Sequence, residues 1–131
     1  MSKRVYIAYK GQEFQIEWYY PPKGESQTLE YYKKLKVQDR RKVLTLFKMM
    51  GEMGAIRNKE KFRYEGEKVY AFKPQPHRFL SFFVEGKKII VTNAFWKKQQ
   101  KLPKSEKDQA LKCMKSYKLR VKEGTYYEKD K

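Results

Sequence analysis

The sequence predicts an α+β domain, in which an antiparallel-rich sheet packs against an N-terminal helical hairpin and one more helix follows at the C-terminal end. Short runs of β-branched and aromatic residues lie at the start and in the middle of the chain, and stretches with helical spacing follow each group. The 131 residues are 40% hydrophobic and 16% aromatic, which is enough for one core. We expect one domain over residues 1–122 and a flexible polar tail over 123–131.

Two strands are expected first, over residues 4–9 and 13–20. The second run alternates, with Phe14, Ile16 and Trp18 on one face. Gly11 lies between the runs and predicts a tight turn, and two prolines after residue 20 end the second strand. These features predict a hairpin at the start of the domain.

Two helices are expected next, with Ser26 as the cap of the first and Asp39 as the cap of the second. Gly51 and Gly54 end the second helix. Its apolar residues recur at i, i+3, i+4 and i+7 and are Val43, Leu46, Phe47 and Met50. This spacing is typical of a helix that packs one face on a core.

The second half of the chain begins with residues 55–67, which we interpret as a polar connector. Strands are expected over 68–73, 78–84 and 87–95, and a last helix after Pro103. The predicted order is therefore β-β-α-α-β-β-β-α.

The charge of the chain indicates an anionic partner. Lysine and arginine number 32 against 15 aspartates and glutamates, a net charge of +17. A positive field of this size attracts nucleic acid, an acidic membrane surface or an acidic protein. The alternative is that the charge only keeps the protein soluble.

The single cysteine, Cys113, excludes an internal disulfide and is expected as a buried thiol. No apolar run is long enough to span a bilayer and no signal-peptide core follows Met1, so we expect a cytoplasmic protein.

Ordered sequence blocks in the second half resemble a known family. They are Tyr70-Ala71-Phe72-Lys73, His77-Arg78-Phe79-Leu80, the string AFWKKQQKLP over 94–103, and Ala110 in the last helix. In this order and spacing they resemble the phage-derived, HigB-like branch of the RelE/HigB-like toxins, with looser similarity back to about Phe14. The resemblance implies a RelE-like fold and a toxin that cleaves messenger RNA on the ribosome. It also implies an antitoxin partner, expected to be a helix-turn-helix protein, and no cofactor.

Metal-independent RNA cleavage proceeds by attack of a 2′-hydroxyl on the adjacent phosphate. The hydroxyl must lose a proton, the phosphorane charge must be stabilised, and the leaving oxygen must gain a proton. Arg78 is the first candidate, because a guanidinium fork suits a phosphate and stays charged. A salt bridge at the sheet surface is the alternative for this residue. The resemblance places a catalytic lysine at Lys73, which would need a lowered pKa to act as a base. An ordinary exposed lysine is an equal alternative there.

Further candidates flank these two residues. Lys97 and Lys98 are the basic pair after the third strand of the second half, and the resemblance places a charge that stabilises the transition state at Lys98. A solvated loop is the alternative for both. His77 is the only histidine and could exchange protons, although a lone histidine is more often structural. No cysteine and histidine spacing predicts a metal site.

Other residues are expected to bind RNA without taking part in the chemistry. Trp96 could stack on a base, and the remaining candidates for phosphate contacts are Lys33, Lys34, Arg40, Arg41 and Lys101. Individually, each lysine or arginine of this set could simply be a solvated charge.

Two departures from the family pattern keep a second function open. Ala71 stands where the pattern has another basic residue, and no tyrosine follows the Lys97-Lys98 pair over 99–107. Tyr117, Tyr126 and Tyr127 are candidates to replace that tyrosine. The alternative to an enzyme is a non-catalytic module on the same fold that binds RNA, ribosomes or an acidic partner. A generic DNA-binding protein is a third interpretation, but the sequence has no helix-turn-helix signature.

Overall fold

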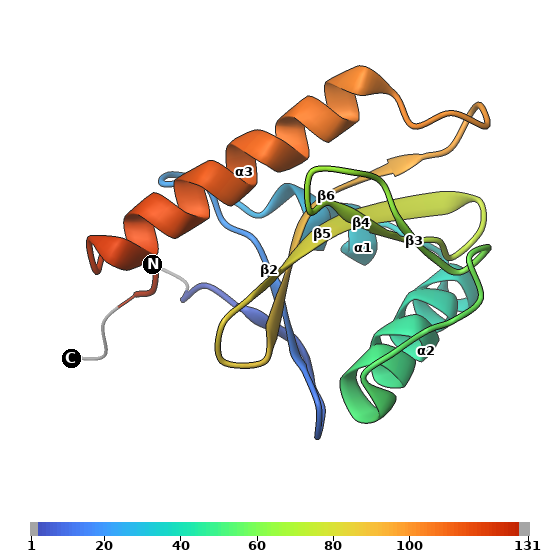
Figure 1. The fold of residues 1–131 in the computed structure, drawn as a ribbon, viewed down its shortest axis with the longest axis horizontal. Helices are drawn as coiled ribbons and strands as arrows, with labels where there is room; N and C mark the ends of the chain where they lie inside the picture. The colour runs from blue at the N-terminus through green and yellow to red at the C-terminus, as the bar shows by residue number, and fades with distance from the viewer. Residues whose placement is uncertain (1–2, 129–131) are drawn as a thin grey trace.

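The computed structural model describes residues 3–128, in which a six-stranded sheet separates helices on its two faces (Figure 1). The α+β class is therefore confirmed. The strands are β1 (Ile7–Lys10), β2 (Gln15–Trp18), β3 (Phe62–Tyr64), β4 (Tyr70–Phe72), β5 (His77–Val84) and β6 (Lys88–Trp96). The helices are α1 (Gln27–Lys33), α2 (Val37–Met53) and α3 (Lys104–Lys122). No helix in this part of the chain has the length and apolar character needed to cross a membrane.

The sheet has the strand order β1-β2-β6-β5-β4-β3. Only the β2–β6 pair is parallel among the described strands, so the sheet is antiparallel-rich as predicted. β5 and β6 form the long central pair, in which Arg78 is opposite Phe95 and His77 is opposite Trp96. The expected polar connector over 55–67 contains β3, which pairs with β4, and this is a correction to the sequence interpretation.

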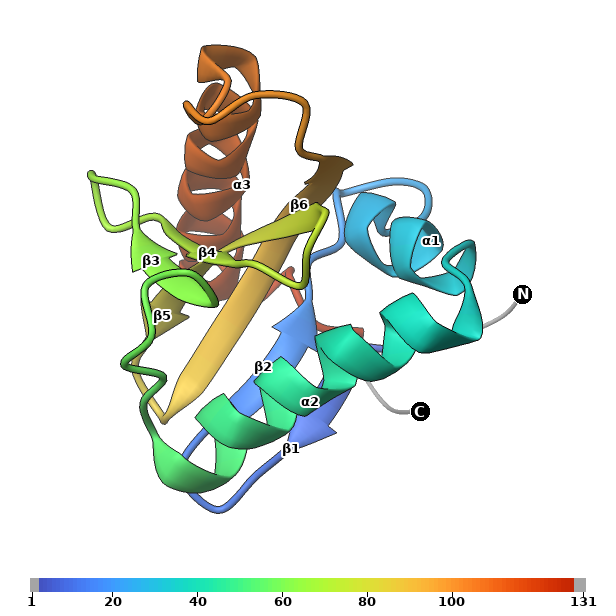
Figure 2. The same ribbon diagram turned by 90° about the vertical axis from the view of Figure 1, so that its right-hand side faces the viewer.

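Helices cover both faces of the sheet. Figures 1 and 2 show α3 on one face and α1 with α2 on the other. Each face has its own buried cluster, with Phe47 and Phe79 among the residues of the α1/α2 side and Leu80 and Tyr117 among those of the α3 side. The two helices follow β1 and β2, as the predicted order has them, but the expected hairpin packs differently: α1 packs on β6, whereas α2 packs on β1 and β2.

Local signals were correct for one helix cap and one turn. The Ser26 hydroxyl accepts a hydrogen bond from the backbone N–H of Leu29 at 3.3 Å and so caps α1. Asp39 does not cap α2, because that helix begins at Val37, and its carboxylate binds a side chain of β5 instead. At the β1–β2 turn, a Cβ atom on Gly11 would collide with the Gly51 backbone, so this turn packs directly on α2.

The segment after α3 is packed on the domain, although the sequence predicted a flexible tail from residue 123. Tyr126 is fully buried, and its hydroxyl accepts a hydrogen bond from the backbone N–H of Tyr20 at 2.9 Å. The backbone N–H of Glu128 donates to the Tyr6 hydroxyl at 2.9 Å. The rest of the predicted tail, residues 129–131, lies outside the described residues.

Candidate functional site

A basic pocket of about 430 Å³ opens between β3, the loop after β4, the facing ends of β5 and β6, and the loop that leads into α3. We call it the first pocket. One carboxylate, that of Glu65, is among its lining residues. Its cationic lining residues are Arg63, Lys73, Arg78, Lys97, Lys101, Lys104 and Lys107. This excess of positive charge suits a polyanion.

Sheet pairing explains why residues far apart in sequence meet in this pocket. Arg78 and Phe95 are cross-strand neighbours on β5 and β6, and both line it. The backbone N–H of Lys73 donates to the Lys61 carbonyl at 2.8 Å, which continues the β3–β4 pairing. The backbone N–H of Lys97 donates to the Pro76 carbonyl at 2.9 Å and holds the loop after β6 beside the start of β5.

Arg78 is buried, with 5% of its surface exposed. Its Nη1 donates to Gln75 Oε1 at 3.2 Å and to the His77 carbonyl at 2.9 Å. Its Nη2 is buried and has no hydrogen-bond partner within residues 3–128. Burial lowers the pKa of this guanidinium, although nearby Glu65 opposes the effect. Holding a buried cation with an unpartnered donor in the folded protein is costly.

Lys73 lies beside Arg78, and its Nζ donates to the Lys59 carbonyl at 3.0 Å. Partial burial lowers the pKa of this amine, the charge of Arg78 lowers it further, and Arg63 and Lys97 add to the effect. Within the described chain, no carboxylate oxygen lies within 4.0 Å of the charged nitrogens of Lys73, Arg78 or Lys97. Lys73 therefore gives up its proton more readily than an ordinary lysine.

The two residues of the predicted basic pair lie in different surroundings. Lys97 and Lys101 line the first pocket, whereas Lys98 is exposed and is not among the lining residues. Trp96 is 61% exposed and lies beside the His77 ring, with ring centroids 6.3 Å apart, and it does not line the pocket either.

His77 belongs to the opposite face of the sheet from Arg78. It is buried, and its Nδ1 lies 2.7 Å from the Tyr31 hydroxyl of α1. Its Nε2 lies 3.1 Å from Asp39 Oδ2 of α2, and this hydrogen bond lowers the pKa of the Asp39 carboxyl. The predicted proton-transfer role does not fit this position, because His77 joins β5 to the two helices and does not face the pocket.

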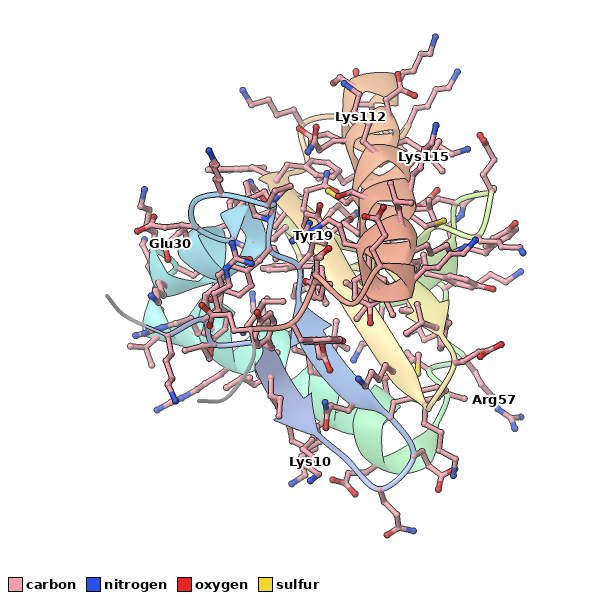
Figure 3. The ribbon with its side chains drawn as sticks, turned by 90° about the vertical axis from the view of Figure 1, so that its left-hand side faces the viewer. Lys10, Tyr19, Glu30, Arg57, Lys112 and Lys115 are labelled. Atoms are coloured by element: carbon pink, nitrogen blue, oxygen red, sulfur yellow. The ribbon has the colours of Figure 1, made fainter. Side chains whose placement is uncertain are left out.

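The four cations predicted on the first two helices do not line the first pocket; they are Lys33, Lys34, Arg40 and Arg41. Other positive charge is spread over α3, from which Lys112 and Lys115 project in Figure 3. The candidate tyrosines are also elsewhere. The hydroxyl groups of Tyr117 and Tyr127 are 2.7 Å apart, Tyr127 also donates to the buried Glu17, and none of the candidate tyrosines lines the first pocket.

Sequence reasoning missed Arg63, Lys104 and Lys107 as lining residues. Arg63 lies on the unpredicted strand β3, and the two lysines lie in the first turn of α3. Lys107 is partly neutralised by Glu67, which lies 3.1 Å from its Nζ. For the two lysines, the sequence offered one signal of their place in the pocket, which was their position at the start of the predicted last helix.

No group of three histidine, cysteine, aspartate or glutamate side chains within residues 3–128 could hold a metal ion. The Cys113 thiol is buried in α3, and burial raises its pKa to about 11. This thiol is therefore a poor nucleophile near neutral pH.

Comparison with known proteins gives one family. The family model for phage-derived Gp49-like proteins (DUF891) matches residues 30–115, which is more than half of the chain. The match includes Lys73, Arg78 and Lys97 of the first pocket and most of the sheet. No curated protein matches the chain.

Proposed function

Because the chain belongs to the phage-derived Gp49-like family, a toxin-like family of the RelE/HigB-like superfamily, we propose that it is the toxin of a toxin–antitoxin system. Its proposed activity is metal-independent endonucleolytic cleavage of messenger RNA on the ribosome. We also propose that its fold is RelE-like and that it belongs to the HigB-like branch.

One observation supports the activity above the others. Lys73 and Arg78, on either side of the β4–β5 loop, and Lys97, after β6, line one pocket and are free of ion pairs within the described residues. The sequence motifs alone also fit an exposed loop and a surface salt bridge. A shared pocket lined by three cations fits a phosphodiester better than either.

Each of these three side chains has one part in the proposed reaction. Lys73 accepts the proton of the 2′-hydroxyl while the 2′-oxygen bonds to phosphorus. Arg78 places its fixed charge beside the non-bridging oxygens, where negative charge grows. The bond from phosphorus to the 5′-oxygen then breaks, and Lys97 gives that oxygen a proton. The products are a 2′,3′-cyclic phosphate and a 5′-hydroxyl.

Cations outside the first pocket supply affinity in this proposal. Lys98 and the predicted cations Lys33, Lys34, Arg40 and Arg41 contact RNA phosphates, chiefly those of ribosomal RNA, and Trp96 is free to stack on a base. The antitoxin is expected to be a helix-turn-helix protein, and a cytoplasmic location follows from these partners.

A second candidate is a non-catalytic module that binds RNA, ribosomes or an acidic partner. Ala71 favours it, because this residue is fully buried under α3 and provides no second charge on β4. Cations can bind a phosphodiester without cutting it, so binding alone does not separate the two candidates.

Induced expression in bacteria tests the proposal. The wild type is expected to arrest growth and to generate new 5′ ends inside translated messages, and Arg78→Ala is expected to do neither. Arg57→Ala is the matched control, because Arg57 projects into solvent in Figure 3 and does not line the first pocket. If the wild type is folded but messenger RNA stays intact, cleavage is refuted and the non-catalytic binding module remains.

A further inference from the structure

We propose that a second pocket beside the first binds the nucleotide next to the scissile phosphate, so that the RNA strand spans both. This inference rests on the proposed function. The second pocket, of about 440 Å³, lies between α2 and the loops that flank β3 and β4. Its cationic lining residues are Arg41, Lys42, Lys61 and Lys73.

The two pockets meet at one side chain, Lys73, which lines both. Gln75 lines the second pocket, and its Oε1 accepts the hydrogen bond from Arg78 Nη1 in the first. Its Nε2 donates to the Glu60 carbonyl at 3.4 Å on the far side. A strand whose phosphate lies at Lys73 and Arg78 therefore enters the second pocket without leaving the positive field.

The lining of the second pocket suits a nucleotide better than a bare anion. Leu46 and Pro74 are largely buried and give the pocket an apolar floor beside its cations. Lys42 is already engaged, by Asp39 at 3.6 Å and by the Gln75 carbonyl at 3.3 Å. Arg41 and Lys61 have no ion pair among the described residues and are exposed, so they are available to a phosphate.

Recognition in this pocket is expected to be tolerant of base identity. No aromatic side chain is among its lining residues, and Glu60 is its one carboxylate. Charge and an apolar surface give affinity for any nucleotide, whereas base choice needs polar groups that match base edges.

Binding of a short RNA that resists cleavage tests the inference. The probe is a uridine trinucleotide with a 2′-deoxy group at the position to be cut, and uridine monophosphate is the short reference. The test variant is the double substitution Arg41→Ala with Lys61→Ala. The control is Lys48→Ala with Arg57→Ala, which removes the same charge from exposed positions that line neither pocket.

The test variant is expected to bind the trinucleotide about tenfold more weakly, while its affinity for the monophosphate stays within about twofold of the wild type. The slope of log affinity against log salt is expected to fall by about 0.7 for each phosphate that the variant no longer binds. The control is expected to match the wild type in both. All four substituted residues are exposed, and thermal unfolding checks that the variants remain folded.

Equal trinucleotide binding by the test and control variants would overturn the inference. So would a drop in affinity for polyglutamate as large as the drop for RNA, because the pocket would then be a docking site for an acidic protein. The outcome is separable from the proposed function. A wild type that binds the trinucleotide as described but cuts no RNA would refute cleavage alone, and a cutting enzyme with no difference between variants would refute the second pocket alone.

Discussion

Replacement of Arg78 by methionine should remove function without weakening the fold. Methionine is long, flexible and uncharged, so it can fill much of the space of the arginine stem. The substitution removes a buried guanidinium that has one unpartnered nitrogen. A buried polar group without a partner costs about 1–3 kcal/mol.

Two hydrogen bonds disappear in return, and their contributions decide the net effect. Gln75 is exposed and can turn its Oε1 to water, so the effect there is small. The His77 carbonyl loses one donor, at a cost of about 1 kcal/mol. The net expectation is a free energy of unfolding between unchanged and about 2 kcal/mol higher than that of the wild type.

Urea unfolding at neutral pH measures this difference, with Lys101→Met as an exposed control expected to stay within about 0.5 kcal/mol. Inorganic phosphate should stabilise the wild type more than Arg78→Met, because only the wild type has the Arg78 guanidinium in the first pocket to bind phosphate. A loss of stability of about 2 kcal/mol or more in Arg78→Met would mean that Arg78 holds the fold together, and the reasoning would be refuted.

Three other predictions follow from the same side chains and from the packed C-terminal segment. Because the pKa of Lys73 is lowered, the cleavage rate should rise with pH and reach half its maximum below the ordinary pKa of lysine, whereas Lys73→Arg, which cannot act as a base, should be inactive in the same pH–rate series. The pair of Asp39 with His77 lowers the carboxyl pKa, so its stabilisation is present above the usual aspartate pKa and is lost as pH falls through the lowered value. Asp39→Asn should therefore lack that step when urea unfolding is repeated down an acid pH series, and an identical pH dependence in both proteins would contradict the assignment. Tyr126→Ala should lower the free energy of unfolding by about 3–5 kcal/mol in thermal or urea unfolding, and no change would mean that the segment after α3 is not packed.

Local patterns predicted the elements whose residues repeat with a clear period, and they missed the one that does not. β3 has only three residues, Phe62-Arg63-Tyr64, within a polar stretch. It forms because it pairs with β4 and because the Phe62 ring stacks on Tyr70, with centroids 5.5 Å apart. Both contacts depend on a neighbouring strand, so the sequence pattern did not predict β3 and therefore did not predict that Arg63 lines the site.

The candidate site could have been predicted more sharply than it was. His77 and Arg78 are neighbours in a strand, and neighbours in a strand point to opposite faces of a sheet. One of the two had to lie away from the pocket. The sequence ranked Arg78 first, but it did not show what holds His77, because the partners of His77, Tyr31 and Asp39, lie 46 and 38 residues away in the chain.

The most direct test of the proposed chemistry is the structure of the cut RNA ends. Messenger RNA incubated with purified protein and ribosomes should end in 2′,3′-cyclic phosphate and 5′-hydroxyl groups, as measured by mass spectrometry. A single 2′-deoxy substitution at the cut position should abolish cleavage there. Cleavage of the deoxy substrate at that position, or products with 5′-phosphate ends, would contradict an attack by the 2′-hydroxyl at the pocket of Lys73, Arg78 and Lys97.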